Sequence, residues 1–180
     1  QLNSTSPPSF FKASAIALLL LALQACSPAL NWREVRVDST PLLALFPCRP
    51  DQGVQSVTLG ERAVKMTTMG FEAGGEMFNL AQVARRGADE DVALLDLWRP
   101  DTLASIPGVR TREAPFLLKK VSASPAPQQI HAAGKRADGS PVVLRAAWFA
   151  VGGALYQVAV YAERDNEAVV EIYFDGLRVD

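Results

Sequence analysis

The side chains that most often carry chemistry are scarce in this chain. His131 is the only histidine, and Cys26 and Cys48 are the only cysteines. No segment has the spacing of a serine-nucleophile elbow, a phosphate-binding loop, a dinucleotide-binding glycine motif or a zinc-binding histidine pair. No Ser, Cys or Asp motif points to His131 as a general base, so we expect a structural or surface histidine. The sequence therefore predicts no catalytic residue, no metal ligand and no cofactor.

Carboxylates are the remaining candidates for chemistry. Glu72, Glu76 and Asp138 would be able to hydrolyse a bond if the fold brought them together, because paired acids need no sequence motif. The acidic run at 89–91 lacks the spaced oxygen ligands and the glycine of a calcium loop. It precedes an apolar helical pattern, where acidic side chains stabilise the positive end of the helix dipole. We interpret it as a helix start.

The segment at 1–26 has the organisation of a secretory signal. An apolar run at 13–23 follows Lys12 and is too short to cross a bilayer, which takes about 20 apolar residues. The sequence Leu-Gln-Ala precedes Cys26 and resembles the lipobox of bacterial lipoproteins. This resemblance implies cleavage of residues 1–25, lipidation of Cys26 and a short tether at 26–31. A secretory signal cut at the same place without lipidation is the alternative.

The residue after Cys26 bears on the location. In enteric bacteria an Asp at this position tends to retain lipoproteins at the inner membrane, and this chain has Ser27 instead. The resemblance therefore implies a periplasm-facing envelope protein, with the outer membrane favoured over the inner. Several buried acyl chains would hold it on the membrane effectively irreversibly.

Composition indicates one folded domain without a strong charge field. The chain has 18 Lys and Arg against 19 Asp and Glu, and 49% of its residues are hydrophobic. The balanced charge argues against nucleic acid as a partner. The length left after residues 1–25 fits a single domain at 32–180, which divides into halves at about 32–110 and 111–180.

Short strands joined by turns occupy most of this domain. Strands are expected at residues 32–37, 41–47, 54–59, 63–72, 76–85, 128–136, 141–151 and 155–162, and helices near 88–106 and 166–174. The segments 71–86 and 149–164 align without a gap, with six of 16 positions identical. We interpret this as duplication of a strand-strand-strand-helix unit, with chance similarity of two hairpins as the alternative.

The expected fold is α+β, with two meander halves forming an antiparallel sheet and two main helices packed on one face. Each helix must bury an apolar stripe against the sheet. Pro100 is expected to kink or split the first helix. The inner stripe expected for that helix is Val92, Leu95, Trp98, Leu103 and Ile106.

An open sheet face is the expected contact surface. Along 141–151, one set of alternate side chains mixes Arg145 with apolar groups, so this face is expected to be partly open to solvent or to a partner. Aromatic side chains nearby extend this expected partner surface. Its members are Arg145, Phe149, Tyr156 and Tyr161.

Three segments carry a family resemblance. Trp-Arg-Glu-Val-Arg at 32–36, Phe-Pro-Cys-Arg-Pro-Asp at 46–51 and Phe-Asp-Gly-Leu-Arg-Val at 174–179 resemble uncharacterised proteobacterial lipoproteins. Two features are more distantly similar to PsbP-like domains, which are antiparallel α/β/α folds in photosynthetic and bacterial proteins. They are an apolar strand followed by Pro, a basic residue and Pro, and a terminal helix that ends in Phe-x-Gly-Leu. That resemblance implies a non-enzymatic, accessory role at a membrane and carries over no functional residue.

Together these observations favour a lipid-anchored envelope protein with a binding, accessory or scaffold role and an envelope protein as its partner. A periplasmic hydrolase with carboxylates gathered by the fold is one alternative. A carrier of a small hydrophobic ligand is another, and it would require a closed cavity of at least about 300 Å³.

Overall fold

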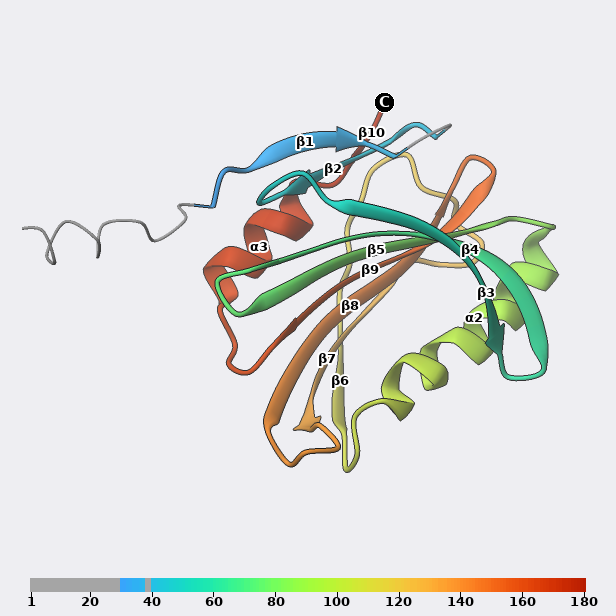
Figure 1. The fold of residues 1–180 in the computed structure, drawn as a ribbon. Coiled ribbons are helices and arrows are strands. Elements are labelled where there is room, and N and C mark those ends of the chain that lie inside the picture. Colours follow the sequence, from blue (N-terminus) through green and yellow to red (C-terminus); the bar gives the residue numbers. More distant parts are fainter. Residues whose placement is uncertain (1–29, 38–39) are drawn as a thin grey trace, which may run out of the picture.

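The computed structural model describes residues 30–37 and 40–180. The predicted signal and the predicted lipidation site Cys26 lie outside these residues. Within them the chain forms two helices and ten strands in two antiparallel sheets (Figure 1). The predicted α+β class with an antiparallel sheet is therefore confirmed. Neither helix in this part of the chain is long and apolar enough to span a membrane.

The larger sheet has seven strands in the order β3-β4-β5-β9-β8-β7-β6. Two three-stranded meanders meet where β5 pairs with β9 at the centre of the sheet, and β6 forms one edge. The strands are β3 (Asp51–Leu59), β4 (Arg62–Ala73), β5 (Glu76–Ala84), β6 (Arg110–Ala114), β7 (Gln128–Lys135), β8 (Pro141–Val151) and β9 (Ala154–Ala162).

A second, smaller sheet covers part of one face of the large sheet together with helix α3 (Glu167–Asp175). We call this the α3 face. The small sheet contains β1 (Arg33–Arg36), β2 (Leu42–Phe46) and β10 (Arg178–Val179) in the order β1-β2-β10. Aromatic side chains fill the space between these layers, and the largest fully buried ones are Phe46, Phe78, Phe149, Tyr156 and Tyr173.

Helix α2 (Ala88–Ala104) covers the opposite face, which we call the α2 face. Its Leu94, Leu95 and Trp98 are buried in the same cluster as Leu144 and Trp148 of β8. The helix continues through Pro100 to its end at Ala104. The predicted inner stripe was right for Leu95 and Trp98 and wrong for Val92, which is 42% exposed.

The prediction that both helices pack on one face is wrong, because α2 and α3 belong to separate cores on opposite faces. The reason lies in the central strands. Nearly every residue of β9 is buried, so both faces of this strand are apolar and both need a cover. One helix on each face, with the small sheet added beside α3, provides that cover.

The two meanders repeat one another closely. The hairpins β4-β5 and β8-β9 have the same register when 71–86 is aligned with 149–164, and their Gly74 and Gly152 both have positive φ, at 64° and 55°. The β5-β9 pairing is symmetric about Leu80 and Val158, which oppose each other. The predicted meander halves are therefore present in the sheet, and the repeat ends where α2 and α3 leave toward opposite faces.

Candidate functional site

The clearest hollow with chemistry in its walls lies on the α3 face, where the sheet is not covered. Its volume is about 290 Å³. Strands β6 to β9 form the floor, and the segment that leads into α3 forms one wall. We call it the basic groove, because its titratable lining consists of Arg110, Arg112, His131, Arg145 and Arg164 against the single carboxylate of Asp165.

A row of cross-strand neighbours forms the centre of this groove. Arg112 of β6 pairs with His131 of β7, and His131 pairs with Arg145 of β8. Val160 of β9 and Phe78 of β5 continue the same row. Since directly opposed side chains lie on the same face, three basic groups adjoin a hydrophobic floor. When His131 is protonated, like charges lie directly opposite each other in this row and weaken the sheet by mutual repulsion.

The loop between β6 and β7 explains where the groove stops. Phe116 in this loop packs on Phe149, with ring centroids 5.5 Å apart, and also contacts Phe174 of α3. The loop thus covers the end of β8 that holds Phe149. The beginning of β8, with Val143 and Arg145, has no such cover and lines the groove.

The arginines of the groove have no ionic partner in the described part of the chain. The ion pairs found there are Arg36–Asp180, Arg85–Asp91, Arg99–Glu113 and Arg178–Glu34. Arg110, Arg112 and Arg164 are exposed, whereas Arg145 is half-buried. The groove therefore presents four guanidinium groups whose charge is not neutralised by an ion pair with any described residue.

His131 reports the electrostatics of this site. Partial burial lowers its pKa, and the positive charges of Arg145 and Arg112 lower it further. Asp165 and Glu167 act in the opposite direction and raise it, with the smaller effect. The imidazole is therefore neutral near pH 7, where it can offer one N–H donor. A bound anion would favour the protonated form, which donates two.

The four residues of the predicted partner surface lie in different environments in the structure. Phe149 and Tyr156 are completely buried, stacked on each other with centroids 5.4 Å apart, so their assignment to a surface is wrong. Tyr161 packs on the α2 face, and its burial raises its pKa. Arg145 alone lies in the groove. Phe116, which covers Phe149, comes from a distant loop that strand alternation does not reveal.

The prediction of the site missed three arginines. Arg110 and Arg112 lie in β6, a strand that was not predicted, and Arg164 follows β9. The alternation Arg-Thr-Arg at 110–112 was the available signal, since residues two apart in a strand share a face.

The carboxylates proposed for hydrolysis gather only in part. Glu72 and Glu76 line one hollow with Glu163 and Asp165, whereas Asp138 accepts hydrogen bonds from Ser140 in the β7-β8 turn. Glu76 is buried, and its Oε1 accepts a hydrogen bond of 2.7 Å from Nδ2 of Asn166, directly before α3. Glu76 thereby fixes the start of the helix that forms the groove wall.

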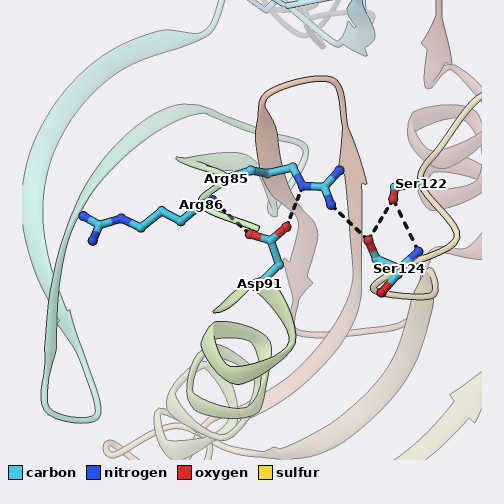
Figure 2. Close-up of polar contacts among 5 residues, drawn as sticks. All are labelled: Arg85, Arg86, Asp91, Ser122 and Ser124. Atoms are coloured by element: carbon cyan, nitrogen blue, oxygen red, sulfur yellow. Dashed lines mark hydrogen bonds and ion pairs between the residues drawn. The ribbon is translucent and has the colours of Figure 1, made fainter. Parts of the chain in front are cut away.

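Asp91, the last residue of the acidic run at 89–91, joins the start of α2 to neighbouring segments, as Figure 2 shows. The buried Asp91 carboxylate lies 2.5 Å from Nε of Arg85 and accepts a hydrogen bond from the backbone N–H of Arg86. Arg85 also donates to the backbone oxygen of Ser124, which holds the loop before β7 against the domain. The acidic run at 89–91 lies in the first turn of α2, which agrees with the predicted helix start.

Trp98 and Trp148 are buried under α2. A hollow of about 410 Å³ lies beside this helix, and charged side chains as well as Val64, Val83 and Leu94 line it. The half-buried Cys48 forms no disulfide within the described residues. In the same part of the chain, no three His, Cys, Asp or Glu side chains come close enough together to hold a metal ion.

The sequence matches no model of a known protein family and no curated protein.

Proposed function

We propose that this chain is a lipid-anchored protein of the bacterial envelope that works by binding and has an accessory or scaffold role. Its anchor would be acylated Cys26, in the lipobox-like sequence, and its domain would face the periplasm, with the outer membrane favoured. The partner proposed for the accessory role is an envelope protein.

The observation that supports binding is the basic groove. Arg112, His131 and Arg145 are cross-strand neighbours without a carboxylate in ionic contact among residues 30–37 and 40–180, and they open onto a hollow of about 290 Å³. Such an arrangement is poised to hold an anionic group, since guanidinium groups form strong charge-assisted hydrogen bonds. The α/β/α order of layers is also the one implied by the distant similarity to PsbP-like domains.

Membrane fractionation tests the anchor. The Cys26→Ala variant should move from the membrane fraction to the soluble periplasmic fraction, because its acyl chains are lost. A Cys48→Ala variant is the matched control and should stay on the membrane. Retention of Cys26→Ala on the membrane would contradict the proposed anchor.

Crosslinking in the native envelope tests the role. After mild crosslinking, the affinity-purified chain should bring down one stoichiometric protein, identified by mass spectrometry. The amount recovered should fall with Cys26→Ala, because the anchor keeps the chain beside its partner. Recovery of small molecules without a stoichiometric protein would contradict a scaffold role and favour a carrier or an enzyme.

A further inference from the structure

Two members of the basic groove have uncharged counterparts in the other half of the sheet. When the two hairpins are aligned turn on turn, Arg145 falls on Thr67. Val54 opposes Thr67 just as His131 opposes Arg145. The same sheet position therefore folds with a valine and a threonine in the first half. Formation of the sheet does not require Arg145 or His131, so their presence needs another explanation.

Protection of the sheet edge explains only part of the cluster. Arg110 and Arg112 lie in the edge strand β6, where charged side chains discourage pairing with other chains. Arg145 lies in the interior strand β8 and is half-buried between His131 and Val160. A guanidinium removed from water without an anion costs free energy, and a bound anion would offset that cost.

The donors of the groove suit a phosphate group. Arg112 and Arg145 are two strands apart, so their backbones are about 10 Å from each other and their long side chains can converge on one group above His131. Guanidinium forks bind phosphate oxygens in pairs, and a phosphate offers acceptors in several directions at once. At the start of α3 in the groove wall, the carboxylates of Asp165 and Glu167 oppose an anion, so the attraction must come from the arginines and His131.

The proposed anchor brings this groove close to a membrane. The tether from Cys26 to Trp32 spans at most about 20 Å when extended. The Trp32 ring packs on Phe78, with centroids 5.7 Å apart. Phe78 is two strands from Arg145 in the same cross-strand row, or about 10 Å between backbones. The tether and the groove therefore meet the same face of the large sheet.

We propose that the basic groove binds the phosphate of an anionic phospholipid headgroup in the membrane that holds the chain. This inference rests on the proposed lipid anchor and gives the domain a second membrane contact. Two contacts would fix how the domain lies on the bilayer, so that the α2 face points away from it toward a partner.

Vesicle binding by the mature chain without its acyl groups tests this proposal. A Cys26→Ala chain of residues 26–180, which lacks the apolar run at 13–23, would be floated with vesicles of phosphatidylcholine, with or without phosphatidylglycerol. In that background, Arg145→Thr and His131→Val introduce the residues found at the counterpart positions, so we expect both variants to fold. Arg62→Thr is the control of equal charge change, because Arg62 is exposed in a hollow beside α2.

Binding should require phosphatidylglycerol and should weaken about tenfold or more with Arg145→Thr, since charge-assisted hydrogen bonds are lost. Arg62→Thr should change it by less than about twofold, because that charge is screened from the membrane. Urea midpoints confirm that the variants are folded. Equal losses with Arg145→Thr and Arg62→Thr, or binding that does not depend on phosphatidylglycerol, would overturn the proposal.

A competition experiment separates the sources of phosphate. Soluble glycerol 3-phosphate should displace the chain from vesicles only weakly, and efficient displacement would assign the groove to a free phosphate compound instead. If vesicle binding fails while crosslinking still recovers one protein, the groove assignment falls and the proposed accessory role stands. If Cys26→Ala stays on native membranes, the anchor itself is wrong whatever the vesicles show.

Discussion

The two hairpin glycines provide a matched pair of substitutions that tests how α3 is held in place. Gly74 and Gly152 occupy equivalent positions in the two aligned hairpins and have similar φ values of 64° and 55°. An added methyl group at Gly152 would meet Pro41 at an ordinary contact distance of 3.6 Å. At Gly74 it would lie 2.8 Å from Oε2 of Glu76, the buried carboxylate bound to Asn166.

The two substitutions should therefore differ in cost. Alanine at positive φ costs about 1–2 kcal/mol at either position. Gly74→Ala must also displace Glu76, and the loss of its charge-assisted hydrogen bond to Asn166 costs about 1.5–3 kcal/mol more. We expect a free energy of unfolding about 1–2 kcal/mol lower for Gly152→Ala and about 3–4 kcal/mol lower for Gly74→Ala.

Urea denaturation of both variants measures this difference. An Asn166→Ala background provides the cross-check. The hydrogen bond between Asn166 and Glu76 is already absent there, so the extra cost of Gly74→Ala should largely disappear. Equal costs for Gly74→Ala and Gly152→Ala would refute the reasoning. They would show that the carboxylate of Glu76 moves aside without penalty and that its contact does not hold the start of α3.

Three further outcomes follow from other polar contacts. Asp91→Ala should lower the free energy of unfolding by about 3 kcal/mol by stranding its arginine partner, whereas the exposed Asp89→Ala should change little by the same measurement. Ser140→Ala should raise the pKa of Asp138, measured by NMR titration, because hydrogen bonds from Ser140 lower that pKa. Because the pKa of Asp138 is lower in the folded protein, this carboxylate adds stability at pH values above its unfolded pKa. That stability is lost as the pH falls through the folded pKa, and the loss should be smaller in Ser140→Ala. Tyr173 should not ionise in the absorbance titration until the protein unfolds in alkali, because complete burial raises its pKa, and Tyr173→Phe should cost about 1 kcal/mol.

Local patterns predicted the elements of this fold better than their arrangement. Alternation along 141–151 correctly placed Leu144 and Trp148 on one face and Phe149 on the other. The Gly-Gly turns identified both central hairpins, since positive φ at Gly74 and Gly152 is a local requirement. These features depend on neighbours in sequence, so the sequence carries them directly.

Which face of the sheet each helix covers depends on contacts between residues that are distant in sequence. An apolar stripe shows that a helix must be covered, and it does not say which face of the sheet lies beneath it. The short strands β6 and β10 were not predicted for a related reason. Strand β6 is exposed along most of its length, and β10 has only two residues, so neither has a clear apolar pattern. Their positions follow from pairing with β7 and β2, and local periodicity is too weak to predict them.

The opposite directions of α2 and α3 also account for the chemical difference between the two halves. The hollow equivalent to the basic groove is lined by Lys65, Thr67 and Gln82 in the first half, and Thr40 and Pro41 from the small-sheet side bound it. In the second half, the start of α3 bounds the groove instead, and β7 and β8 stay open beside it. A repeated sheet with helices on opposite faces thus has one face that differs between its halves. That asymmetry gives the second half a position where basic side chains can meet a ligand without disturbing the shared core.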